Sequence, residues 1–239
     1  MDLAPGHPEI LRLVAPNPGP MTLEGTNTYL YGSDPAFVID PGPADDGHLE
    51  AVRRAAATRG GVGGVLLTHS HGDHAGGVAS LGAELVKLAD GESAAGLTAV
   101  ATPGHADDHL CFLAGGVCFS GDLVLGEGST IVPPDGGSLV AYLDSLERIR
   151  RLRPELICPG HGPWIEDPRA KLDEYVEHRM MRERRLLAAL DRGERSRAAL
   201  VAEVWDDAPT ELRPAAMLAM EAHLQKLEGE GRLPADLRD

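Results

Sequence analysis

Residues 68–74 read Thr-His-Ser-His-Gly-Asp-His and directly follow the apolar run Gly-Val-Leu-Leu at residues 64–67. Four side chains that can bind a metal therefore fall within six residues at the end of an expected buried strand: His69, His71, Asp73 and His74. They cannot all point the same way from one regular element, but a loop at a strand end can turn them towards one point. The spacing indicates a metal site.

Three more potential ligands stand in similar local sequences. His105 ends Thr-Pro-Gly-His, Asp122 ends Phe-Ser-Gly-Asp and His161 ends Cys-Pro-Gly-His, each after a short apolar stretch. The glycine before each of them permits a sharp turn at the end of a strand. A single histidine at such a place is most often a hydrogen-bonded structural residue. The repeated pattern predicts instead that the three residues join the 69–74 cluster along one edge of a sheet.

The expected ligand set is too large for one metal ion. Tetrahedral zinc takes about four ligands, whereas this set has seven members: His69, His71, Asp73, His74, His105, Asp122 and His161. Two metal ions per chain are therefore expected. Imidazoles with few carboxylates and no thiolate favour Zn²⁺ over magnesium or calcium, while iron and manganese stay open as alternatives.

The remaining pattern predicts a layered α/β protein. Short runs with period-two alternation and β-branched residues, bracketed by Gly and Pro, predict strands. They lie at residues 10–14, 26–31, 36–40, 64–68, 84–88, 98–102, 110–113, 117–120 and 156–158. Helices are expected at residues 45–59 and 139–151. Strands in succession with helices interspersed predict two mixed β-sheets with helices outside them. The pattern does not fix the order of the strands.

After Pro168 the sequence becomes predominantly helical. Helices are expected at residues 171–190, 197–205 and 215–228, and a glycine-flanked turn then precedes Arg232. We therefore predict two domains, a catalytic domain at residues 1–167 and a small helical module at residues 168–239. The first of these helices carries a group of arginines that is interpreted as a solvated face, with contact to an anionic substrate as the less frequent alternative: Arg179, Arg182, Arg184 and Arg185.

The metal motifs resemble those of the metallo-β-lactamase superfamily, whose ligand positions the seven residues match in order. The match covers the chain from Ile10 to Gly162. The resemblance implies a four-layer αβ/βα sandwich. It also implies one metal held by His69, His71 and His105, a second held by Asp73, His74 and His161, and Asp122 as the bridge between them.

The branches of this superfamily narrow the expected activity. True β-lactamases generally lack the bridging aspartate, so Asp122 argues against the degradation of antibiotics. Hydroxyacylglutathione hydrolases share the complete ligand set. The β-lactamase-like endoribonuclease branch resembles the chain more closely, and polyketide-releasing thioesterases are similar to that branch. The resemblance to the branch rests on residues 26–29, 102–109, 120–128 and 223–228. It implies that the C-terminal module is winged-helix-like.

Activation of water is the expected chemistry. Zinc lowers the pKa of bound water from near 16 to about 7, which supplies hydroxide as the nucleophile. Asp73 is predicted to bind the second metal and to orient that hydroxide. His109 is predicted to hydrogen-bond the substrate or the leaving group, with a structural role as its alternative. Asp40 is a candidate hydrogen-bond partner for a ligand histidine, and Ser129 and Thr130 are expected near the pocket.

The charge distribution weighs against nucleic acid as the substrate. Residues 1–167 carry 9 Lys and Arg against 22 Asp and Glu, and aromatic residues that could stack on bases make up 4% of the chain. We therefore expect a hydrolase that cleaves a small ester or thioester, with cleavage of single-stranded RNA as the alternative and DNA binding disfavoured. A zinc-stabilised binding module without turnover is a third hypothesis, which the bridging carboxylate argues against.

The start of the chain lacks the pattern of a secretory leader, and the sequence has no uncharged apolar run of about 18 residues. A cytoplasmic protein without membrane association is therefore expected. The three cysteines lack C-x-x-C spacing and are expected to be reduced thiols in the core. The sequence leaves the oligomeric state open.

Overall fold

Two five-stranded β-sheets form the centre of the molecule in the computed structural model, which describes residues 1–237. The first sheet has the order β1 (Asp2–Ala4), β2 (His7–Val14), β3 (Asn27–Tyr31), β4 (Ala36–Ile39) and β5 (Val62–Leu66). The second has the order β10 (Leu156–Pro159), β9 (Val117–Gly121), β8 (Leu110–Ala114), β7 (Leu97–Ala101) and β6 (Ser93–Ala94). Only the pairs β4–β5 and β9–β10 are parallel, so both sheets are mixed, as predicted.

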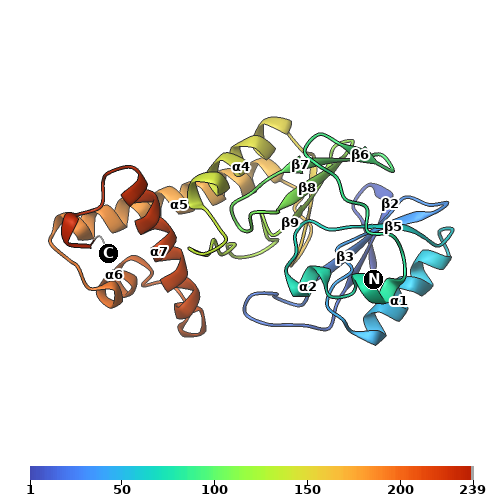
Figure 1. The fold of residues 1–239 in the computed structure, drawn as a ribbon, viewed down its shortest axis with the longest axis horizontal. Coiled ribbons are helices and arrows are strands. Elements are labelled where there is room, and N and C mark those ends of the chain that lie inside the picture. Colours follow the sequence, from blue (N-terminus) through green and yellow to red (C-terminus); the bar gives the residue numbers. More distant parts are fainter. Residues whose placement is uncertain (238–239) are drawn as a thin grey trace.

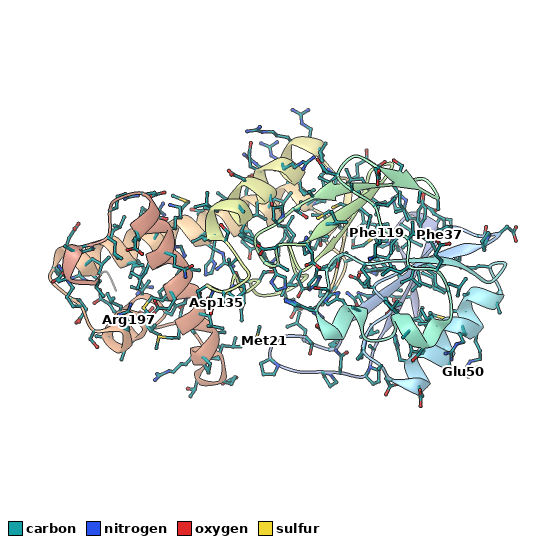
Figure 2. The ribbon with its side chains drawn as sticks, viewed as in Figure 1. Met21, Phe37, Glu50, Phe119, Asp135 and Arg197 are labelled. Carbon is teal, nitrogen blue, oxygen red and sulfur yellow. The ribbon has the colours of Figure 1, made fainter. Side chains whose placement is uncertain are left out.

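The alternation of side chains along each strand creates four layers (Figure 1). Tyr29 of β3 belongs to the apolar core that both sheets share, whereas the next residue, Leu30, packs with residues of helix α1 (Asp46–Ala57). Phe119 of β9 lies in the shared core, where Figure 2 labels it, whereas Cys118 packs with helices α4 (Leu139–Leu152) and α5 (Pro168–Asp191). The layers therefore run helix, sheet, sheet, helix, and the predicted sandwich is confirmed.

The carboxyl ends of the two parallel strand pairs meet at the same edge of the sandwich. The strands β4 and β5 end at Ile39 and Leu66, and the short helices α2 (Gly72–Ala75) and α3 (Val78–Leu81) follow β5. Asn27 joins the sheets at this edge, because its side-chain amide donates to the carbonyl oxygens of Pro159 and Gly162, at 2.9 Å each. These cross-links fix the loops that follow the strands.

The C-terminal part has a separate apolar core, made by α6 (Arg197–Val204), α7 (Arg213–Gly229) and the end of α5. Two short 3₁₀ helices, η1 (Thr210–Leu212) and η2 (Ala235–Leu237), complete it. Helix α5 serves both parts, because Tyr175 packs in the core beneath α4 whereas Leu186 packs in the C-terminal core. The boundary between residues 167 and 168 stays a prediction, and the last two residues of the predicted module, 238 and 239, lie outside the described residues.

The structure differs from the sequence-based expectations at two places. The strand expected at residues 84–88 is reduced to one isolated bridge, between Leu85 and Val65. The residues on either side of Leu85 do not continue the pairing with β5, so no strand forms. The arginine-rich part of α5 is not a uniformly solvated face, because Arg179 is 3% and Arg182 is 5% exposed.

The three cysteines are buried and free, as expected. None of the helices formed by residues 1–237 combines the length and the apolar character that crossing a membrane requires.

Candidate metal centre

The seven predicted ligands come together at the edge where the strands end. The loop after β5 and helix α2 supply four of them, and the loops after β7, β9 and β10 supply one each. Their ligand atoms lie in two groups, each within 4.8 Å: a first group of His69, His71 and His105, and a second group of Asp73, His74 and His161. A ligand atom of Asp122 lies within the same distance of His69 and His74. The three ligands that follow a strand and a glycine therefore lie in the same cluster as residues 69–74, as the sequence pattern predicted.

Three imidazole nitrogens meet in the first group. His71 Nδ1 lies 3.0 Å from His69 Nε2 and 3.0 Å from His105 Nε2. Three histidines from two separate loops therefore direct ring nitrogens at one small volume, which is an arrangement typical of a metal site.

The second group combines two imidazoles with a carboxylate. His74 Nε2 lies 3.3 Å from His161 Nε2, and Asp73 Oδ2 lies 3.3 Å from the same nitrogen of His161. His74 and His161 are buried, while the Asp73 side chain is 32% exposed. Asp73 therefore forms the side of this group that faces the solvent.

Asp122 lies between the two groups. Its Oδ1 atom is 3.3 Å from His74 Nε2 and 3.4 Å from His161 Nε2, while its Oδ2 atom is 3.7 Å from His105 Nε2. Oδ1 is buried and has no hydrogen-bond partner. A buried carboxylate oxygen without a partner is costly, so the position of Asp122 is accounted for best by cations on either side of it.

Asp40 orients two of the histidines from behind. His74 Nδ1 lies 2.8 Å from Asp40 Oδ2. The Thr68 hydroxyl donates to the same carboxylate at 2.7 Å and therefore accepts from His69 Nδ1, 3.0 Å away. Both imidazoles thus carry their proton on Nδ1 and turn the Nε2 lone pair into the centre, as a metal ligand must. The expected contact of Asp40 with a histidine is confirmed.

Main-chain carbonyls orient two more histidines in the same way. His105 Nδ1 donates to the carbonyl oxygen of Ile131 at 2.8 Å, and His161 Nδ1 donates to that of Gly25 at 3.2 Å. Nε2 is thereby the ring nitrogen that each of them has left for a metal. Oriented imidazoles and an unpaired carboxylate oxygen together fit a pair of metal ions, and the nitrogen and oxygen donors fit zinc, iron or manganese.

The pKa values of the ligands reflect burial and mutual contact. Burial lowers the pKa of His69 to about 2, and the neighbouring His74 adds to the effect. Burial also acts on His161, but contacts with Asp122 and Asp73 outweigh it and raise its pKa to about 9. For Asp122, burial acts upwards, yet His74 and His161 hold its pKa well below the usual range. Protons and metal ions therefore compete for the second group.

His109 lies behind Asp122 and does not line the cavity in front of the centre. Its Nε2 atom accepts the backbone N–H of Asp122 at 3.2 Å, and its Nδ1 atom lies 2.8 Å from Thr102 Oγ1. The side chain is buried, and burial, followed by the effect of His105, lowers its pKa to about 3. Both ring nitrogens of this neutral imidazole are thus engaged with the protein. The geometry favours the structural alternative over contact with a leaving group.

The segment at residues 128–131 also holds two of the proposed ligands in place, Asp122 and His105. The Thr130 hydroxyl donates to the carbonyl oxygen of Asp122 at 2.7 Å, next to the Ile131 carbonyl that orients His105. Arg179 of α5 donates in turn to the Thr130 carbonyl oxygen. Ser129 and Thr130 also line the cavity in front of the centre, as expected. The sequence did not indicate the carbonyl contacts of Ile131 and Arg179, because any residue type supplies a backbone oxygen.

Comparison with known proteins identifies relatives over most of the chain. The model of the metallo-beta-lactamase superfamily matches residues 21–87 and 83–161, and that of the beta-lactamase associated winged helix domain matches residues 196–235. The beta-lactamase-like protein 2 homolog of Caenorhabditis elegans is 34% identical over 254 residues, which cover 93% of this chain and 85% of that protein. The atrochrysone carboxyl ACP thioesterase of Passalora fulva is 32% identical over 266 residues, covering 97% of this chain and 79% of that protein.

A solved structure extends the likeness to the whole fold. The crystal structure of a metallo-beta-lactamase family protein from Thermus thermophilus superposes with a TM-score of 0.78 at 25% identity and covers 95% of both chains. Two mixed sheets between helices, with imidazoles and carboxylates gathered at their strand ends, define a hydrolase of the αβ/βα class. The chain belongs to the metallo-β-lactamase superfamily. It carries the associated winged-helix domain and is not a true β-lactamase.

Proposed function

We propose that this protein is a binuclear zinc hydrolase that cleaves a small, apolar ester or thioester. The observation that carries the proposal is the cavity in front of the metal centre, which has a volume of about 550 Å³. Its walls are largely apolar: Met21, Leu23, Leu125, Ile131, Leu212 and Leu218. Figure 2 shows Met21 and Asp135, which also line this cavity, between the sandwich and α7.

The charges of the cavity argue against a polyanion as substrate. Among the described residues that line it, none is Lys or Arg, whereas Glu127 and Asp135 are acidic. RNA binding depends on cationic side chains that neutralise phosphates, and the described lining holds no Phe, Tyr or Trp ring on which a base could stack. An acyl group that places no charge against these walls suits them better. The thioesterase named among the relatives supports the same choice.

The residues of the centre are proposed to act as follows. The seven ligands would hold two zinc ions, which would supply Lewis acidity and make water a nucleophile near neutral pH. Asp73 lines the cavity and accepts a hydrogen bond from the attacking water, which it thereby orients towards the acyl carbon. The apolar walls hold the acyl group and keep other water away. Addition of water to the acyl carbon and departure of the thiol or alcohol yield a carboxylic acid.

A parallel assay of substrates tests the proposed activity. The zinc-loaded chain is incubated with acyl thioesters, aryl esters and a labelled single-stranded RNA at near-physiological salt. We expect turnover of thioesters that a chelator abolishes, and strong loss of kcat in Asp73→Asn. The matched control is Asp135→Asn, which changes a second carboxylate of the same cavity that is not a proposed ligand. Efficient cutting of RNA beside inert thioesters contradicts the proposal.

Metal analysis tests the binuclear arrangement separately. We expect close to two zinc ions per chain, because the proposed ligands form two groups with Asp122 between them. Asp122→Ala removes the only carboxylate that approaches both groups among the described residues, so it should lower the bound zinc and abolish turnover. Near-full activity of Asp122→Ala at one zinc per chain rules out a two-metal mechanism. Loading with iron or manganese in place of zinc shows which metal supports the fastest turnover.

A further inference from the structure

A second cavity, of about 400 Å³, adjoins the one in front of the metal centre. We call it the α5–α7 cavity, since α5, α7 and the residues just before α7 form most of its wall. Its apolar lining includes Tyr175, Trp205, Pro209, Leu212 and Ala216. The two cavities share residues 128–131, Leu212 and Ala215 in their walls. An occupant of one is therefore close to an occupant of the other.

Arg179 brings an uncompensated charge to this lining. Its side chain is 3% exposed and its guanidinium lies 5.3 Å from the Tyr142 ring. One nitrogen, Nη2, donates to the Thr130 carbonyl oxygen, whereas the buried Nε has no hydrogen-bond partner. Within residues 1–237, no carboxylate lies within ion-pair distance of Arg179. A buried guanidinium without a counter-ion is costly unless an anion completes the site.

The other charged groups of the cavity are already paired. Arg182 contacts Asp207 at 2.8 Å, and Glu174 contacts Lys171 at 3.2 Å. His178 adds no charge near neutral pH, because burial, together with Arg179 and Arg182, lowers its pKa to about 4. A negative group that enters the cavity therefore meets one available partner, which is Arg179.

We propose that the α5–α7 cavity binds a compact amphipathic carboxylate, whose anionic end pairs with Arg179 and whose apolar body packs against Trp205 and Ala216. Arginine suits this role because its guanidinium presents several N–H groups to a carboxylate. The carboxylate belongs either to the acyl group of a substrate held at the metal centre or to a separate small molecule. The first source rests on the proposed function, whereas the site itself does not.

The fluorescence of Trp205 reports on this cavity directly. The chain has two tryptophans, so Trp164→Phe leaves Trp205 as the only one. In this full-length background we expect hexanoate to change the emission saturably and hexan-1-ol to bind at least tenfold more weakly. Arg179→Met should weaken hexanoate binding at least tenfold. The matched control is Arg184→Met, which removes an exposed arginine from the same helix and should leave binding unchanged.

A second variant covers the case in which Arg179→Met does not fold. Ala216→Leu keeps the arginine and narrows the cavity, so it should weaken hexanoate binding at least tenfold as well. Circular dichroism and thermal melting identify the variants that are folded. The proposal is overturned by the absence of a saturable change with hexanoate. Equal affinities for folded Arg179→Met and Arg184→Met overturn it as well.

Turnover assays distinguish the two sources of the carboxylate. If the substrate supplies it, Arg179→Met raises KM for a glutaryl thioester about tenfold more than it raises KM for the neutral pentanoyl thioester. If a separate molecule supplies it, hexanoate binds without competing with either thioester. Both results support the site. If no thioester is hydrolysed, the proposed function fails, but the fluorescence titration still decides whether the cavity binds a carboxylate.

Discussion

His109 is a buried histidine whose two ring nitrogens both contact other groups of the protein. Its Nε2 atom accepts the hydrogen bond of the Asp122 backbone N–H. Because this place is buried, only a water molecule could replace His109 as the acceptor. The His109→Phe variant leaves that N–H unpaired, which we expect to cost about 1–3 kcal/mol of unfolding free energy. Because the N–H belongs to the residue between the two ligand groups, zinc affinity should also fall about 10- to 100-fold.

Competition with a chromophoric chelator measures the zinc affinity of His109→Phe, and urea unfolding measures its stability. The comparison variant is His109→Gln, which retains an acceptor and should recover part of both losses. A direct catalytic role for His109 predicts a different result. In that case kcat of the fully zinc-loaded variant falls while zinc affinity stays at the original value.

His223 provides a test of pH dependence far from the metal centre. It is buried against Trp205, and neither of its ring nitrogens has a hydrogen-bond partner. Burial, followed by the effect of Arg179, lowers its pKa to about 3. An unfolded histidine takes up a proton near pH 6.5, which the folded state cannot do until about pH 3. His223 therefore costs stability progressively as the pH falls from about 6.5 towards 3.

We expect His223→Leu to match or exceed the stability of the unmodified protein at pH 7.5, because it removes two unsatisfied polar atoms. At pH 5 its advantage should grow by about 2 kcal/mol, which corresponds to about 1.5 pH units below the ordinary histidine value. Urea unfolding at both pH values measures the difference. His223→Gln separates titration from polarity, because it cannot bind the proton but keeps the polar atoms. A constant difference between pH 7.5 and pH 5 contradicts this account.

The loops that follow the strands depend on close packing of glycine at the metal centre. A Cβ atom on Gly160 would lie 2.4 Å from Asp122 Oδ1 and 2.7 Å from His74 Cε1. Gly160→Ala therefore pushes ligands apart without removing any of them. We expect zinc affinity to fall at least tenfold while circular dichroism stays unchanged. Gly72→Ala is the control, because it lies between His71 and Asp73 and its Cβ meets no heavy atom within 4 Å. Equal zinc affinities of the two variants contradict this prediction.

At the level of elements, the sequence predicted what depends on neighbouring residues. Periodicity placed a helix at residues 139–151, close to the observed Leu139–Leu152, because its apolar face repeats at helical spacing. The expected strand at residues 84–88 failed, since a strand also needs a partner with which to pair. Strand order and register are likewise long-range properties that periodicity does not contain.

The candidate site likewise has features that the local sequence predicts and features that depend on distant residues. Its ligand types and spacing are local, so the sequence indicated His105 and His161 before their positions in space were known. The contacts that orient them are not local, because Ile131 and Gly25 act through backbone oxygens whose identity is independent of residue type. Arg179 illustrates the same limit. Its position in a charged helix indicated solvent, whereas the side chain is buried and contacts Thr130 and the ring of Tyr142.

The molecule as a whole shapes the cavity in front of the metal centre, because Leu212 and Leu218 come from the C-terminal part. Leu218 is 40% exposed at this wall. Burying a leucine side chain contributes about 1.5–3 kcal/mol, so contact with an acyl group adds part of that amount to binding. We expect Leu218→Asp to lower kcat/KM for an apolar thioester about tenfold, or about 1.4 kcal/mol. Zinc content and thermal stability should stay unchanged.

Steady-state kinetics across a series of acyl lengths measures the effect of Leu218→Asp, and the loss should increase with the length of the chain. Leu152→Asp is the control, because this exposed leucine ends α4 and does not line the cavity. Loss of zinc in Leu218→Asp contradicts the assignment of Leu218 to substrate contact. An equal loss of kcat/KM for all acyl lengths contradicts it as well.

The walls of the cavity in front of the metal centre come from two parts of the chain, only one of which contains the proposed ligands. All seven proposed ligands precede Gly162, while part of the substrate wall belongs to residues 212–218. Random substitution confined to the second region should therefore yield variants that accept new acyl groups and still bind zinc normally. One part of the cavity wall is therefore encoded apart from the proposed ligands, so that selection can alter this part and leave the ligands intact.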